Sequence, residues 1–86
     1  MSTDDAGHDA SARARPVKRS FSIAGHKTSI SLEAAFWEAL REAAARDNVS
    51  LASLVQRIDQ TRGSAGLSSA VRVWLLRDAR RTHLPL

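Results

Sequence analysis

The chain has 86 residues, no cysteine and a formal net charge of +4. This length favours a single domain, and the lack of cysteine excludes disulfide scaffolds, thiolate metal sites and cysteine nucleophiles. The basic balance favours a polyanionic partner such as nucleic acid. No stretch is long and apolar enough to span a bilayer, and the first residues lack the pattern of a secretory signal, so we expect a cytoplasmic protein without membrane contact.

Residues 1–16 are rich in Ser, Ala, Gly and Asp and hold almost no large apolar side chain. Such a segment cannot offset the entropy cost of ordering, so we expect a disordered arm. Basic side chains cluster at the end of this arm and just beyond it. The candidate phosphate contacts among them are Arg13, Arg15, Lys18 and Arg19. The simpler interpretation of each one, taken singly, is a solvated surface charge.

The segment that follows alternates apolar and polar side chains, with Val17, Phe21 and Ile23 at one parity. Gly25 can take the positive φ that a tight turn requires, so the pattern predicts an N-terminal strand that forms a hairpin with the next segment. An extended arm lying along DNA is the alternative. His26 at the turn is a candidate phosphate contact, although simple turn occupancy is the more common role.

Residues 27–32 alternate in the same way, which is typical of a half-buried strand. One face carries Thr28, Ile30 and Leu32. The opposite face carries hydrogen-bond donors and acceptors and one cation, on Lys27, Ser29 and Ser31. Two copies of this strand, paired across a twofold axis, would form a ribbon whose polar face fits the major groove of DNA.

Helical spacing begins directly after this strand. Apolar side chains at i, i+4, i+7 and i+8 from Phe36 predict a first helix over residues 33–47, with Glu33 in its first turn. Asn48 suits a left-handed stop. Ser50 suits the N-cap of a second helix that ends near residue 60.

A loop rich in small residues separates the second helix from a third, which we expect over residues 68–80 with Ser68 or Ser69 as its cap. A buried strand is the alternative for its apolar run, but the segment is long enough to favour a helix. Pro85 cannot continue a helix interior, so residues 82–86 are expected to form a tail.

This order of strand, helix, short turn and helix resembles the ribbon-helix-helix family of bacterial DNA-binding proteins. The motifs that carry the resemblance are Arg-Ser-Phe-Ser-Ile-Ala-Gly-His-Lys-Thr-Ser-Ile-Ser-Leu-Glu at residues 19–33, Asn-Val-Ser-Leu-Ala-Ser-Leu-Val at residues 48–55 and Leu-Ser-Ser-Ala at residues 67–70. The match is closest to a subfamily of short predicted regulators, and it covers most of the chain apart from the arm and the tail.

The resemblance implies a mainly α fold with a short β-ribbon, formed as an intertwined homodimer, with residues 17–81 as the domain and the third helix as an addition. It implies base reading by Lys27, Ser29 and Ser31. It implies phosphate binding at the N-terminus of the second helix, by Val49, Ser50 and Leu51. The implied core of the dimer consists of Ile30, Leu32, Phe36, Leu40, Leu54 and Ile58. Many family members carry two or three long side chains on the ribbon, whereas this chain has one Lys and two short Ser.

The sequence therefore predicts a sequence-specific DNA-binding transcriptional regulator, expected to act as a repressor, whose ligand is double-stranded DNA. The alternative is a protein-interaction adaptor or an antitoxin that binds a protein partner through residues 67–80. The three histidines lack ligand spacing and the carboxylates look solvated, so we expect no metal, no cofactor and no enzymatic activity. Trp37 and Trp74 are expected in the core or an interface rather than as stacking platforms for bases.

Overall fold

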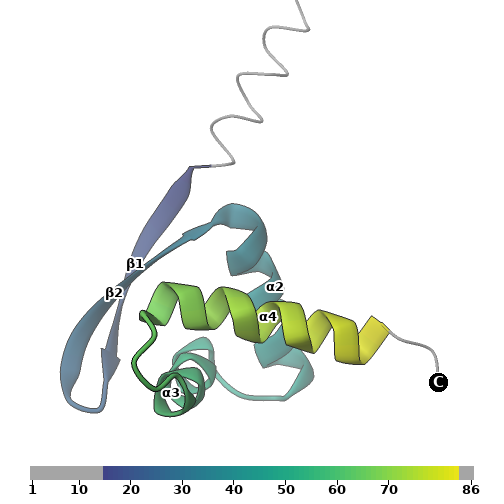
Figure 1. Ribbon diagram of the computed structural model, residues 1–86. Helices are drawn as coiled ribbons and strands as arrows, with labels where there is room; N and C mark the ends of the chain where they lie inside the picture. The colour runs from purple at the N-terminus through teal and green to yellow at the C-terminus, as the bar shows by residue number, and fades with distance from the viewer. Residues whose placement is uncertain (1–14, 84–86) are drawn as a thin grey trace, which may run out of the picture.

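The computed structural model describes residues 15–83 and contains two strands followed by three helices (Figure 1). The strands are β1, Pro16–Ile23, and β2, His26–Glu33. The helices are α2, Ala34–Arg46, α3, Leu51–Thr61, and α4, Leu67–His83. The hairpin lies along one side of the molecule, and the three helices gather beside it. The predicted fold class, a short β-ribbon with mainly helical structure and an additional C-terminal helix, is confirmed.

β1 and β2 form an antiparallel hairpin through a two-residue turn at Ala24 and Gly25. Both residues have positive φ, 52° and 82°, which is the combination that a type I′ turn requires. The ladder runs from Ile23 opposite His26 to Pro16 opposite Glu33. The hairpin is confirmed and the extended-arm alternative is wrong for these residues. The expected arm overlaps β1 by one residue, and its first 14 positions lie outside the described part of the chain.

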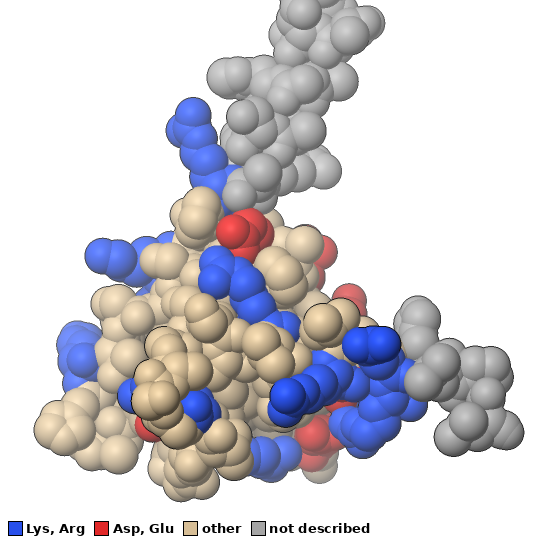
Figure 2. All heavy atoms as spheres, in the orientation of Figure 1, with Lys and Arg blue, Asp and Glu red and all other residues tan. Residues whose placement is uncertain are grey.

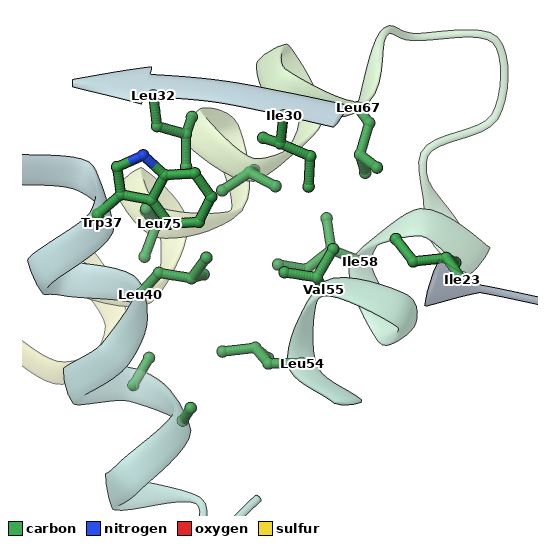
Figure 3. Packing of buried hydrophobic residues seen from close by; sticks show 13 residues of the cluster. Ile23, Ile30, Leu32, Trp37, Leu40, Leu54, Val55, Ile58, Leu67 and Leu75 are labelled. Carbon is green, nitrogen blue, oxygen red and sulfur yellow. The ribbon is translucent and has the colours of Figure 1, made fainter. Parts of the chain in front are cut away.

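The core lies between one face of the hairpin and the apolar stripes of the helices (Figure 3). Its largest fully buried side chains are Trp37, Ile30, Leu32, Leu40, Leu54, Ile58, Val55 and Val71. Five of the six residues expected in the core of a dimer are therefore already buried within one chain. Phe36, the sixth, is half-buried. Whether two copies share this core stays a prediction.

Trp37 joins α2 to β1. Its side chain is 1% exposed, and its Nε1 donates a hydrogen bond to the carbonyl oxygen of Val17 at 2.9 Å. The Phe21 ring stacks on the indole with centroids 5.9 Å apart. The guanidinium of Arg19 lies over the same indole, 5.4 Å from its centroid. This contact explains why a cation interrupts the apolar parity of β1: the Arg19 side chain covers an aromatic face.

The ends of α2 and α3 follow local side-chain and backbone chemistry. Asn48 has a φ of 60°, as expected for a left-handed stop, and the Ser50 side chain accepts a hydrogen bond from the backbone N–H of Ser53 at 3.0 Å. One expectation is wrong: Glu33 is the last residue of β2 and the N-cap position of α2, not part of its first turn. The buried stripe of α2 also begins at Trp37 rather than Phe36.

α4 is a helix, as expected, but it starts at Leu67 and continues to His83, so the first two residues of the expected tail are helical. A buried carboxylate fixes its far half: Asp78 is 7% exposed and accepts hydrogen bonds from Arg46 of α2 at 2.7 Å and from Arg81 at 2.6 Å. The hydrogen bond to Asp78 raises the pKa of Arg46. This ion pair holds the end of α2 against α4.

We expect Trp37→Ala to destabilise the fold by about 3–5 kcal/mol, because the substitution leaves a large cavity and removes the bond to Val17. Urea denaturation followed by circular dichroism measures the change. Trp74→Ala is the matched control, since Trp74 is only half-buried. An equal loss of stability in both variants would contradict the role given to Trp37.

Candidate nucleic-acid interface

The hairpin turns one face away from the core. Cross-strand partners share a face, so the register groups three side chains from each strand. We call this set the polar hairpin face: Lys18, Ser20 and Ser22 from β1, and Lys27, Ser29 and Ser31 from β2. Five of the six are exposed, and Ser31 is half-buried. The Ser20 and Ser29 hydroxyl oxygens lie 3.4 Å apart, within hydrogen-bonding distance.

The opposite face of β2 is apolar, as the strand parity predicts. Ile30 and Leu32 are 0% exposed, whereas Lys27 and Ser29 on the other face are exposed. Because the side-chain period of a strand is two, this separation follows from the register of the hairpin. Within residues 15–83, both lysines and three of the four serines of this face are therefore exposed to an external ligand.

The backbone of β2 also has an outer edge. A type I′ turn closes with a hydrogen bond between the residues that flank it, here Ile23 and His26, and hydrogen-bonded pairs then alternate along the ladder. The backbone groups of Lys27, Ser29 and Ser31 consequently point away from β1. Within residues 15–83, the hydrogen bonds between backbone groups outside the helices and the hairpin ladder do not involve Lys27 or Ser29.

At Ser31 this outer edge is occupied by α4. The backbone N–H of Ser31 donates to the hydroxyl of Ser68 at 3.2 Å, and its carbonyl oxygen accepts from Arg72 Nη2 at 3.4 Å. The sequence suggested Ser68 or Ser69 as a helix cap, which is wrong because both lie inside α4, and it gave no role to Arg72. Ser68 and Arg72 are four apart, so helical spacing could have placed them on one face of α4, although not against β2.

Arg72 also binds the end of β2. Its Nη2 donates to Glu33 at 3.1 Å and its Nε at 3.2 Å, and the guanidinium lies over the Phe36 ring, 5.7 Å from the centroid. The pKa of Glu33 is lowered from its ordinary value of 4.5, chiefly by a hydrogen bond from its own backbone N–H; burial opposes this shift and Arg72 adds to it. The negative charge of Glu33 is thus compensated where the polar hairpin face ends.

At the N-terminus of α3, some of the hydrogen-bonding groups already have partners within the chain. Val49 donates its backbone N–H to the carbonyl oxygen of Ala44 at 2.9 Å, so this amide is already hydrogen-bonded within the fold, and its predicted phosphate contact stays a prediction. The Ser50 hydroxyl bonds to Ser53. By their position in the first turn, the N–H groups of Leu51 and Ala52 have no acceptor inside the helix. These two amides are the groups of this turn that suit an anion.

The other candidate phosphate contacts are spread over the hairpin and its approach. Arg15 and Lys18 are exposed, and His26 is exposed directly after the turn. Arg19 lies on the core side of the hairpin, against Trp37. Arg13 lies outside the described residues. Figure 2 shows basic side chains along the hairpin side of the molecule and around the C-terminal half of α4.

A second surface lies between α2 and α4. An open groove of about 470 Å³ is lined by Ala35, Phe36, Ala39, Arg72, Val73, Leu75, Leu76 and Ala79. Two of its large apolar side chains are exposed, Val73 at 47% and Leu76 at 57%. Apart from Arg72, whose charge faces Glu33, the lining carries no charged group. This α2–α4 groove is suited to an apolar partner rather than to DNA.

For residues 15–83, two further classes of site are metal centres and membrane spans. This part of the chain contains no cluster of three or more His, Cys, Asp or Glu side chains that could hold a metal ion. None of its helices combines the length and the apolar character needed to cross a membrane.

The sequence matches a known domain family over most of its length. A sequence profile described as a ribbon-helix-helix domain matches residues 16–79, which include both strands and most of the three helices. The chain belongs to the ribbon-helix-helix family. As a ribbon-helix-helix protein it has a fold associated with DNA-binding regulators and antitoxins.

One solved structure, an uncharacterized protein from Bordetella pertussis Tohama I, is similar along the chain. The two share 31% sequence identity with a TM-score of 0.70, over 99% of this chain and 75% of the other. No curated protein matches this ribbon-helix-helix chain.

We expect Glu33→Gln to lower the melting temperature at neutral pH by removing the ion pair with Arg72. Because folding lowers the pKa of Glu33, its contribution is present above the unfolded pKa and is lost as the pH falls through the folded pKa. The difference between wild type and variant should therefore shrink in acid. Thermal melts across a pH series measure it, with the exposed Glu38→Gln as control. A difference that grows in acid would contradict this assignment.

Proposed function

We propose that this protein is a sequence-specific DNA-binding transcriptional regulator that acts as a homodimer in the cytoplasm. The observation that carries the proposal is the polar hairpin face, which presents two lysines and four serines on the side of the hairpin away from the core. A β-ribbon is one of the elements that the major groove accommodates. Lysine donates to guanine O6 and N7, and a serine hydroxyl donates to or accepts from several bases.

The outer edge of β2 is the proposed site of dimerisation. Lys27 and Ser29 direct their backbone groups toward this edge, and a second copy of β2 would satisfy them by antiparallel pairing. Such pairing places two polar hairpin faces side by side on one surface. A symmetric protein surface suits an operator with two related half-sites.

Base reading is assigned to Lys27, Ser29 and Ser31, as the family resemblance implies. Phosphate contacts are assigned to Arg13, Arg15 and Lys18 and to the first-turn amides of α3. Phosphate contacts supply affinity without sequence information, and base contacts supply the discrimination. A dimer bound to an operator excludes other proteins from the same stretch of duplex, which supports repression as the regulatory outcome.

We expect the double variant Lys27→Ala with Ser29→Ala to lose its preference for a cognate site while it stays folded. Each lost base contact costs about 1–3 kcal/mol of discrimination. The cognate site is first selected from random and genomic duplexes with the wild-type protein. Competition binding against a scrambled duplex then measures the preference.

Arg80→Ala is the control for this experiment, since Arg80 is exposed on α4 and away from the hairpin. Circular dichroism verifies the fold of both variants. Discrimination that is unchanged in the double variant would reject the assignment of base reading to the ribbon. Failure of the wild-type protein to bind any duplex would reject the proposed function itself.

A second candidate function is a protein-interaction adaptor or antitoxin, and the α2–α4 groove is the observation that favours it. Exposed apolar side chains such as Val73 and Leu76 are commonly buried in a complex. In this case the ribbon-helix-helix fold would serve as a scaffold and residues 67–80 would bind the partner.

We expect Leu76→Glu to abolish binding of such a partner, because the new carboxylate would be buried without a counter-charge. Gln56→Glu is the matched control: it adds the same negative charge at an exposed position of α3. Affinity purification with all three proteins measures partner retention. The adaptor function is supported if a stoichiometric protein is lost only from Leu76→Glu while wild type binds genomic and random duplexes equally weakly. Equal retention by both variants would exclude the groove.

A further inference from the structure

The hydrogen bonds from α4 to Ser31 limit how the β2 strands of two copies can pair. Antiparallel pairing about Ser29 would require the backbone groups of Ser31, which Ser68 and Arg72 already bind. Pairing about Lys27 would place two like charges directly opposite each other, which is destabilising. Pairing about Thr28 sets Lys27 opposite Ser29 of the second copy, so the two lysines do not face each other. Its hydrogen-bonded pairs use the backbone groups of Lys27 and Ser29 and do not require those of Ser31.

In that arrangement β1 lies on the far side of β2 in each copy, so the sheet has the strand order β1, β2, β2, β1. Three inter-strand spacings separate the two outer strands by about 14 Å. The major groove is only about 12 Å wide. The two β2 strands can therefore face the groove, whereas the two β1 strands lie over the phosphates at its rims.

The side chains of β1 suit that position. Lys18, Ser20 and Ser22 lie on the same face as Lys27 and Ser29. Serines are short enough to let the strand approach the DNA backbone closely, and their hydroxyls donate to phosphate oxygens. Among the described residues, the ion pairs do not include Lys18 or Lys27.

We infer that β1 is a phosphate-contacting strand, with Lys18, Ser20 and Ser22 touching the backbone of duplex DNA, while Lys27 and Ser29 of β2 face the bases. This inference rests on the proposed function and adds to it. It divides the polar hairpin face by strand: β1 provides affinity and register on the duplex, and β2 provides discrimination.

The pairing of the strands is tested with single cysteines, because the chain has none of its own. Pairing about Thr28 places the two Thr28 residues opposite each other at about 4.5 Å between Cα atoms, within the range of a disulfide. Thr28→Cys should therefore cross-link into a dimer under mild oxidation, and Ser29→Cys should cross-link much less. A reversed preference, or a wild-type protein that stays monomeric, would overturn the four-stranded sheet.

The role of β1 is tested with Lys18→Ala, measured on a cognate and a scrambled duplex over a series of salt concentrations. Each lost phosphate contact reduces the slope of log affinity against log salt by about 0.9. A dimer loses two, so we expect a slope shallower by about 1.8 and an affinity reduced by the same factor on both duplexes. Arg80→Ala removes the same charge from α4 and should leave the slope unchanged.

A hydroxyl contact is tested with Ser22→Asp, which we expect to weaken binding at least about tenfold on both duplexes because it sets a carboxylate against phosphate. Ser22→Ala, which removes the hydroxyl without adding a charge, is the control and should weaken binding less. If the β1 variants change the preference between duplexes, β1 reads bases and the inference is overturned. If they change nothing while wild type still binds DNA, β1 lies away from the duplex, and the proposed function stands without this inference.

Discussion

The register of the β1–β2 hairpin is the constraint on which the rest of the structure depends. Positive φ at both Ala24 and Gly25 fixes a two-residue turn, and this turn fixes every cross-strand pair that follows. A slip of one residue would exchange the two faces of a strand, exposing Ile30 and Leu32 and burying Ser29. The register of the hairpin consequently determines both which side chains form the core and which form the polar hairpin face.

Within residues 15–83, the carboxylates that form ion pairs do so with arginines, and the two lysines of the polar hairpin face stand outside these pairs. The ion pairs of residues 15–83 join arginines of the helices, or the C-cap Arg62 of α3, to carboxylates. Examples are the contacts of Asp78 with Arg46 and Arg81 and of Glu33 with Arg72. Neither lysine of the polar hairpin face takes part in them. Exposed cations outside these ion pairs therefore lie on the polar hairpin face, and others lie on α2 and α4.

α4 extends the ribbon-helix-helix unit in two ways. It closes part of the outer edge of β2 through Ser68 and Arg72, and with α2 it forms the apolar α2–α4 groove. The first contact restricts how a second strand can add to the sheet, since a backbone group that is already bonded is no longer available. The second leaves an apolar surface outside the core. Through both effects, α4 bears on the proposed pairing of two copies and on the proposed binding of a protein partner.

The sequence by itself determined the strands and helices of this protein, because they depend on local chemistry. Period-two alternation predicted the strands, Gly25 predicted the turn, and Asn48 and Ser50 predicted the boundaries of the helices. Side-chain parity likewise predicted the separation of Lys27 and Ser29 from the core. Only the tertiary structure decided the long-range contacts, including the hydrogen bond of the buried Trp37 to β1 and the hydrogen bond between β2 and α4. The physical reason is that periodicity fixes which face of an element a residue occupies, whereas the partner of that face depends on how distant segments pack.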